Sequence, residues 1–342
     1  LITSELDAQL FSTGFFQIRG DDKLFNKFIY YYLTSNLFKQ QKDKLCSGST
    51  QSALNDESAK KIFVPLPPFE EQEAIVAKIE ELLSELENGK QQLLTAQQQL
   101  KVYRQSLLKW AFEGKLTNKK VKEGELPKGW KEVQIKDVAT MNPKTPNREN
   151  ISKQMEVQFL PMKLVEEIIN KIHLTEIRKY EDVLKGSYTP FINGDVIFAK
   201  VTPCMENGKI AIVDNLKNGI GFGSSEFHVL RAGDKIKSNF LFYFLVQDGF
   251  RHKAASEMTG AVGLRRVPKQ FIENYSIPLP SIKEQQLIVS ELESKLTVCD
   301  KIEETISHSL QQAETLRQSI LKKAFEGKLV TTEKMTVVNE LH

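Results

Sequence analysis

Two long stretches of the chain carry hydrophobic residues at steps of three and four. The first runs from Ile75 to Trp110 and the second from Ile288 to Ile320. An apolar period near 3.5 residues predicts a coiled-coil helix in each. Prolines precede each stretch, and Gly114 or Gly327 follows it, as expected at helix ends. About 43 helical residues would make a rod of roughly 65 Å.

The period places Tyr103 and Trp110 in the first apolar seam, and Ile302 and Leu316 in the second. Two alternatives are ordinary amphipathic helices that pack on their own domains, and a zipper between two molecules. Helices within one chain meet at a high effective concentration. We therefore expect the two helices to pair with each other, antiparallel about a pseudo-twofold axis.

The two stretches belong to a repeated unit. A shift of 213 positions lays Pro65-Leu66-Pro67 on Pro278-Leu279-Pro280 without a gap. Counted from this turn, about 22 of 53 aligned positions are identical. The segment 111–116, Ala-Phe-Glu-Gly-Lys-Leu, returns letter for letter at 324–329. The sequence therefore contains an internal duplication.

The segments upstream of the two helices are also similar, though more weakly. With one residue of slippage, residues 15–33 parallel residues 227–245. About 87 residues of the second unit have no counterpart in the first, so we expect the chain to start within its first domain. The expected organisation is a first domain at 1–64, a helix at 65–117, a second domain at 118–277, a helix at 278–330 and a tail at 331–342.

Short patterns in the second domain predict strands at 157–160, 195–200 and 208–213, and a helix at 240–246. The glycine-rich segment 219–223 has neither the spacing nor the following helix of a phosphate-binding loop, and it predicts a turn before a strand. The fold class is therefore α+β: two homologous α+β domains separated by two long helices that form an antiparallel coiled coil.

Composition narrows the possible classes. The 342 residues suffice for two domains, and no run approaches the roughly 20 apolar residues of a membrane span. Three dispersed cysteines and five histidines fit neither a disulfide scaffold nor a zinc site. A net charge of +3 permits a nucleic-acid partner without arguing for one. The first residues lack a signal-peptide pattern, so we expect a cytoplasmic protein.

Catalytic motifs are missing from the sequence. It contains no Walker lysine, no Gly-x-Ser-x-Gly and no nuclease-type carboxylate cluster. The segment 142–145, Asn-Pro-Lys-Thr, lacks the aromatic residue and second proline of loops that bind a flipped adenine. We therefore expect a binding protein without a cofactor of its own. Two similar domains held apart by a stiff spacer suit a DNA target with two separated parts.

Specific motifs support this interpretation. The segment Leu126-Pro127-Lys128-Gly129-Trp130, the Pro-Leu-Pro turn followed by Glu284-Gln285, and the repeated Ala-Phe-Glu-Gly-Lys-Leu resemble the specificity subunit of type I restriction-modification systems. The resemblance covers nearly the whole chain. It implies a non-catalytic subunit with two target recognition domains, each reading half of a bipartite double-stranded DNA site. The first of these domains would be N-terminally truncated.

The resemblance also implies partners. The helices would form a spacer that docks two methyltransferase (modification) subunits, which supply S-adenosylmethionine. Restriction subunits, which use ATP with Mg, would join that core. Competing interpretations are a coiled-coil adaptor without DNA contacts and, disfavoured by the missing motifs, a stand-alone enzyme.

Two loops of the second domain carry the residue types that read DNA. In 200–209, Asn can pair with adenine, Glu with cytosine, and Lys with phosphate or guanine; the alternative is a hairpin turn with surface lysines. In 259–269, two glycines allow close backbone approach beside a basic cluster; the alternative is a solvated charge run. The predicted DNA-contacting residues here are Lys200, Thr202, Met205, Glu206, Asn207, Lys209, Ser225, Gly260, Arg265, Arg266 and Lys269.

The corresponding positions of the first domain are polar. They predict weaker DNA contacts at Thr13, Ser49, Thr50, Gln51 and Lys60. The repeated segment at the helix ends predicts a partner surface. A helix cap needs only a glycine and an apolar anchor, so capping does not explain why the charged residues of the segment are repeated as well. That surface would comprise Phe112, Glu113 and Lys115, with Phe325, Glu326 and Lys328 in the second copy.

Overall fold

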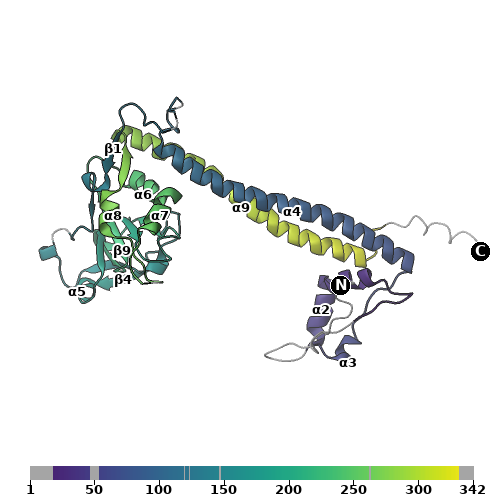
Figure 1. Cartoon of the computed structure of the whole chain (residues 1–342). Coiled ribbons are helices and arrows are strands. Elements are labelled where there is room, and N and C mark those ends of the chain that lie inside the picture. Colours follow the sequence, from purple (N-terminus) through teal and green to yellow (C-terminus); the bar gives the residue numbers. More distant parts are fainter. Residues whose placement is uncertain are drawn as a thin grey trace, which may run out of the picture. The chain divides into compact units, whose positions relative to one another are not determined.

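A computed structural model describes residues 18–46, 54–118, 120–122, 124–145, 148–261 and 263–330. The chain divides into two compact units: unit 1 comprises 1–99 and 302–342, and unit 2 comprises 100–301. Helices α4 (Phe69–Phe112) and α9 (Ile282–Phe325) contain 44 residues each and run through both units (Figure 1). The prediction of two long helices is confirmed.

The described part of unit 1 contains three short helices besides its segments of the long ones. They are α1 (Asn26–Leu33), α2 (Asn36–Leu45) and α3 (Asp56–Ala59). The Ser35 hydroxyl accepts a hydrogen bond from Phe38 N (3.3 Å) and so caps α2. The core joins the start of α4 to the end of α9, so the two helices are antiparallel here. Its largest members are Phe28, Tyr32, Ile79, Leu321 and Phe325.

The described part of unit 2 is built on sheets. Strands β1 (Lys131–Gln134) and β10 (Ser276–Leu279) pair antiparallel and close the domain. A four-stranded antiparallel sheet has the order β2 (Ala139–Met141), β9 (Phe227–Ala232), β6 (Val196–Ala199), β7 (Ile210–Ile212). Another has the order β4 (Glu176–Lys179), β3 (Glu156–Leu160), β8 (Ile220–Gly223), β5 (Thr189–Ile192), in which β3 and β8 are parallel.

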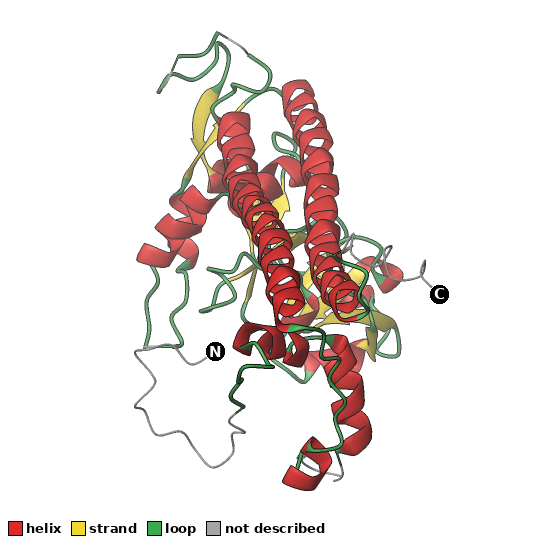
Figure 2. Cartoon of the chain, turned by 90° about the vertical axis from the view of Figure 1, so that its right-hand side faces the viewer, coloured by secondary structure: helices red, strands yellow, loops and turns green. Residues whose placement is uncertain are grey.

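Helices complete unit 2 (Figure 2). They are α5 (Tyr180–Leu184), α6 (Ser238–Val246), α7 (Asp248–Ser256) and α8 (Lys269–Asn274), with 3-10 turns η1 (Ile135–Asp137), η2 (Arg148–Asn150), η3 (Met162–Leu164) and η4 (Lys217–Gly219). The strands predicted at 157–160, 195–200 and 208–213 correspond to β3, β6 and β7, and the predicted helix is α6. The mixture of helices and sheets confirms the α+β class.

The prediction of a turn at 219–223 is wrong, because residues 220–223 form strand β8. Its glycines have a packing reason. Gly221 pairs with Phe191 of β5, and a Cβ on Gly221 would lie 2.1 Å from the Phe191 ring. The aromatic ring therefore takes the space that a side chain on β8 would need.

The main core of unit 2 joins α6 to the end of α4 and the start of α9. Phe240 and Phe244 of α6 are buried beside Phe112 and Ile288. Arg104 of α4 pairs with Asp300 of α9 (2.7 Å). Since Asn118, beyond the end of α4, binds Glu284 near the start of α9 (3.0 Å), the helices are antiparallel in this unit as well.

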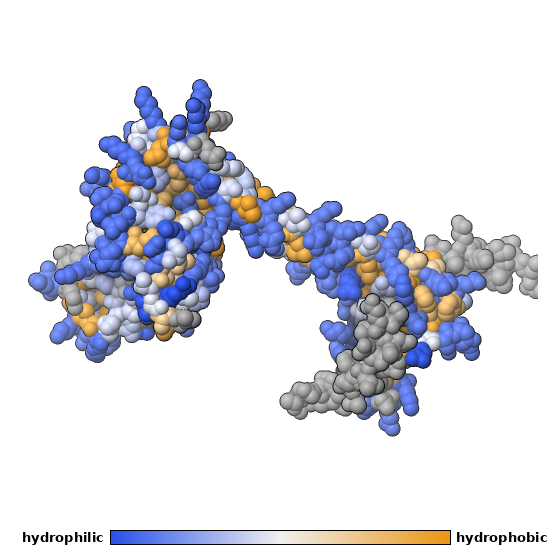
Figure 3. Space-filling model, in the orientation of Figure 1, coloured by the Kyte–Doolittle hydropathy of each residue, from blue (hydrophilic) through white to orange (hydrophobic). Residues whose placement is uncertain are grey.

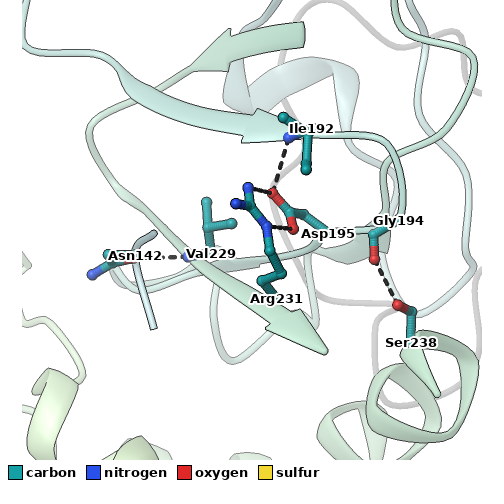
Figure 4. A network of polar contacts seen from close by, with 7 residues as sticks. All are labelled: Asn142, Ile192, Gly194, Asp195, Val229, Arg231 and Ser238. Atoms are coloured by element: carbon teal, nitrogen blue, oxygen red, sulfur yellow. Dashed lines mark hydrogen bonds and ion pairs between the residues drawn. The ribbon is translucent and has the colours of Figure 1, made fainter. Parts of the chain in front are cut away.

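A buried ion pair fastens β6 to β9 (Figure 4). The fully buried Asp195 carboxylate accepts hydrogen bonds from Arg231 Nε and Nη2 (2.7 Å each) and from Ile192 N (2.9 Å). Ser238 at the start of α6 donates to Gly194 O (2.6 Å). These bonds fix the strands that carry the loops described below.

Part of the predicted apolar seam is wrong. Tyr103, Trp110, Ile302 and Leu316 are 38–52% exposed. Leu108 and Ala111 are buried instead, because the end of α4 turns its core face toward α6. Apolar side chains are accordingly visible along the surface of the long helices (Figure 3). In the described part of the chain, no helix has the length and apolar character needed to cross a membrane.

Candidate nucleic-acid interface

Three segments of unit 2 that are distant in sequence meet at one place. The Lys200 loop (200–209) follows β6, and the Ser225 turn (224–226) lies between β8 and β9. The Arg266 loop (259–269) precedes α8, and its Val262 lies outside the described residues. Each contains residues that the sequence predicted to contact DNA.

Backbone hydrogen bonds join these segments. Lys200 N donates to Glu226 O and Val267 N donates to Lys200 O, each at 2.9 Å. Thr202 N donates to Arg265 O (3.1 Å). Lys200 therefore contacts both other segments, and the three segments form one surface.

Basic side chains border this surface. Lys200 Nζ donates to Ser225 O (2.7 Å), and Ser225 itself is exposed. Arg265 is exposed, and Lys269 at the start of α8 pairs with Glu273 (3.1 Å). Positive charge of this kind attracts the phosphate backbone of a nucleic acid.

Arg266 forms a two-pronged ion pair with Glu226. Its Nε and Nη2 donate to the two carboxylate oxygens at 2.8 and 2.7 Å. This contact lowers the pKa of Glu226, chiefly through the hydrogen bond from Arg266. The carboxylate is therefore ionised at neutral pH and holds the guanidinium in one orientation.

His228 lies buried behind the surface. Its Nε2 is 3.0 Å from Val267 O, which can only accept, so Nε2 carries the proton. Its Nδ1 accepts from Asn142 Nδ2 (3.2 Å), and Asn142 Oδ1 accepts from Val229 N (2.9 Å; Figure 4). Burial lowers the pKa of His228, with smaller contributions from Lys200 and Lys269, so the ring is neutral.

The prediction that Met205 contacts DNA is wrong, because its side chain is fully buried in the main core. Other residues of the Lys200 loop also point inward in part. Thr202 Oγ1 donates to Glu206 Oε1 (2.9 Å), and Lys209 Nζ donates to Val165 O (2.9 Å). These half-buried side chains fix the loop, and their contact with DNA stays a prediction.

Asn207 is the exposed polar residue at the tip of the Lys200 loop, and Gly260 is exposed in the Arg266 loop. Gly260 has φ of +123°, a conformation that favours glycine. Asn207 Nδ2 donates to Glu167 Oε1 (2.9 Å). Glu167 belongs to a hairpin, residues 165–172, that sequence reasoning missed. This hairpin carries Ile168 and Ile169, which are 42% and 49% exposed.

The predicted contacts of the first domain are mostly untested. Thr13, Ser49, Thr50 and Gln51 lie outside the described residues. Lys60 follows α3 and is exposed, which is compatible with a DNA contact and does not test it.

At the helix ends, the structure differs in part from the predicted partner surface. Phe112 and Phe325 are 6% and 8% exposed, so both are core residues and the prediction that they bind a partner is wrong. The charged residues of the same segments form matching pairs: Lys115 with Glu113 (2.6 Å) and Lys328 with Glu326 (2.8 Å). Glu113 and Lys115 are half-buried, whereas Glu326 and Lys328 are exposed. A partner contact at these four residues stays a prediction.

Among the described residues, no group of three or more His, Cys, Asp or Glu side chains could hold a metal ion. Loops of the sheet domain thus carry basic and amide side chains, and the domain packs on the two long helices. The chain belongs to the type I restriction modification DNA specificity domain family, whose model matches residues 6–96 and 127–312.

Two curated relatives are specificity subunits of type I restriction enzymes from Escherichia coli. The EcoAI subunit is 39% identical over 198 residues, which is 58% of this chain and 33% of that protein. The EcoDI subunit is 27% identical over 325 residues, 89% of this chain and 70% of that protein. The chain thus spans about a third of the length of the EcoAI subunit.

Solved structures share the fold. The HsdS subunit from Thermoanaerobacter tengcongensis matches with a TM-score of 0.55 and 22% identity, over 88% of this chain and 70% of that one. A chain from a study of complex assembly and conformational transition of the type I R-M system matches with a TM-score of 0.68 and 21% identity, over 88% and 71%. The predicted family and fold are confirmed.

Proposed function

We propose that the chain is the DNA-reading subunit of a type I restriction-modification complex. In this proposal its two target recognition domains each read one half of a bipartite double-stranded site. The chain itself is non-catalytic. Two methyltransferase subunits with S-adenosylmethionine, and restriction subunits with ATP and Mg, perform the reactions.

One observation carries this proposal most directly. The Lys200 loop, the Ser225 turn and the Arg266 loop come from separate parts of the sequence and are held together by backbone hydrogen bonds. Lys200, Arg265, Arg266 and Asn207 belong to these joined loops, and Asn207, Arg265 and Arg266 are exposed. Lysine and arginine suit phosphates and guanine, and asparagine suits adenine.

The spacer role rests on the long helices. Each contains 44 helical residues, and a helix of that length extends over about 66 Å. A spacer of constant length converts the separation of two reading domains into a number of base pairs. The exposed charged residues Glu326 and Lys328 are candidates for the contact with a methyltransferase subunit.

Salt-dependent DNA binding separates this function from that of an adaptor. The full chain, mixed with a random duplex library, should enrich a bipartite sequence, and its affinity should fall steeply between about 50 and 200 mM salt. Lys200→Ala and Arg265→Ala should each reduce the slope of log K against log salt by about 1. Lys185→Ala, which removes an exposed lysine of the α5 region, is the control. Binding without sequence preference at any salt concentration would refute the proposal.

A further inference from the structure

The contact between Arg266 and Glu226 leaves part of the guanidinium free. Arginine has five N–H groups. Glu226 accepts one from Nε and one from Nη2, and Leu264 O accepts one from Nη1 at 3.3 Å. One N–H on Nη1 and one on Nη2 remain. The Arg266 side chain as a whole is still 45% exposed.

Both partners of the pair are mounted rigidly. Arg266 exchanges two backbone hydrogen bonds with Thr259. Arg266 N donates to Thr259 O (2.8 Å), and Arg266 O accepts from Thr259 N (3.0 Å). Glu226 O accepts from Lys200 N (2.9 Å), and Glu226 N donates to Ser224 Oγ (3.2 Å). The guanidinium is therefore fixed at its backbone and at its far end, which reduces the entropy lost when it binds a ligand.

Two parallel donors match the two acceptors that guanine presents in the major groove, O6 and N7. A phosphate also accepts from arginine, but the carboxylate of Glu226 beside the guanidinium opposes a purely electrostatic contact with DNA. A phosphate can also accept two such donors, but a phosphate carries no sequence information, whereas a base edge read by a guanidinium of fixed orientation does.

We propose that Glu226 is a positioning residue that holds Arg266 in the orientation needed to read one guanine of the target. The inference rests on the proposed function and specifies one base contact within it. Glu226 need not touch the DNA. It fixes the orientation of Arg266, so that Arg266 distinguishes one base from another and does not only attract the negative charge of DNA.

Base-by-base binding measurements test this role. The wild-type chain is first used to select its target from a random duplex library. Each G·C pair of that target is then replaced in turn, and affinities are compared for wild type, Glu226→Gln and Arg266→Lys. Arg266→Lys keeps the charge but loses the fixed two-donor edge. Glu257→Gln, in the exposed Lys253 pair, and Arg265→Ala are matched controls.

We expect both variants to lose the preference for the same single G·C pair, by about tenfold, and to keep the preferences at other positions. The affinity of Glu226→Gln for random DNA should stay equal or rise, since a negative charge is removed. A merely structural role of Glu226 would weaken all positions and random DNA together. Glu257→Gln should change nothing, and Arg265→Ala should weaken all sequences alike.

Two results would overturn the inference: every base preference kept in Arg266→Lys and Glu226→Gln, or uniform weakening of all sequences in Glu226→Gln. Thermal unfolding of each variant shows whether the domain is intact, and Glu226→Asp, which keeps the carboxylate, should restore part of the preference. A wild-type chain that selects no sequence at all would instead refute the proposed function.

Discussion

At the scale of single residues, two buried glutamines join the start of each long helix to the segment that precedes a shorter helix. Gln72 and Gln285 occupy equivalent positions of the two repeats and are both fully buried. Gln72 Nε2 donates to Pro67 O (2.8 Å) and Gln285 Nε2 to Pro280 O (3.0 Å). Each also binds the backbone ahead of the neighbouring helix: Gln72 to Lys23 O and Phe25 N, and Gln285 to Lys235 O and Lys237 N.

Replacing Gln285 tests these hydrogen bonds. Gln285→Ala removes the side-chain partner of three backbone groups, one buried and two part-buried, and we expect it to lower the free energy of unfolding by about 3 kcal/mol. The neighbouring Gln286 is exposed, so Gln286→Ala should change the free energy of unfolding by no more than about 0.5 kcal/mol. Urea unfolding of both variants measures the difference; equal stabilities would contradict the role of Gln285.

His228 makes stability depend on pH. Because burial lowers its pKa below the usual value near 6.5, the unfolded chain binds its proton more readily than the folded chain. The stabilisation is complete above pH 6.5 and is lost as the pH falls toward the folded-state pKa, by at most about 1.4 kcal/mol per pH unit. Urea unfolding between pH 7.5 and 5 should show a smaller loss in His228→Gln than in wild type. His252→Gln, which replaces an exposed histidine, is the control: it should lose as much stability over this pH range as the wild type.

Sequence patterns selected loops that the structure brings together, but did not give the direction of each side chain. Lysines on both sides of a turn suggested that Lys200 and Lys209 both face DNA, yet Lys209 points to Val165 O. Met205 is buried because the loop turns it into the core. Inward and outward positions alternate irregularly in a loop, so no periodicity reports them.

At the scale of elements, the two helix ends share one design. Gly114 and Gly327 have φ of +74° and +71°. In each case the residue after the glycine donates to the carbonyl five positions earlier: Lys115 to Trp110 and Lys328 to Lys323, both at 2.8 Å. This is a Schellman motif, and it forms where the glycines predicted the helix ends.

The phenylalanine of each repeated segment anchors the helix end in a core. Phe112 lies 4.8 Å from Phe240 and 5.3 Å from Phe244, centroid to centroid. We expect Phe112→Ala to lower the free energy of unfolding by about 3–5 kcal/mol. Trp110→Ala, two residues away and 38% exposed, should cost no more than about 1 kcal/mol. Calorimetry that finds the larger loss at Trp110 would contradict this assignment.

Helical periodicity predicted the long helices well and their faces less well. A 3.5-residue period locates a seam between two helices, but the end of α4 also packs on α6. A third element moves the buried face from Trp110 to Leu108 and Ala111. The period of one helix carries no information about such a neighbour.

At the scale of the whole molecule, each compact unit combines parts of both repeats. In unit 1, Phe325 of the second copy packs on Phe28 and Tyr32 of the first (5.1 Å each). In unit 2, Phe112 of the first copy packs on the second domain. The identical Ala-Phe-Glu-Gly-Lys-Leu segments thus meet equivalent surfaces. Self-comparison predicted the duplication, but not that each helix ends on the other copy's domain.

Exchange of the second domain tests the central claim most directly. Residues 126–277 would be replaced by the corresponding domain of a specificity subunit with a different target, and the chain combined with its methyltransferase subunit. Sequencing of the methylated DNA should show a new sequence in one half-site and the original sequence in the other. An unchanged methylated sequence would contradict the account, because the loops of unit 2 would then read no DNA.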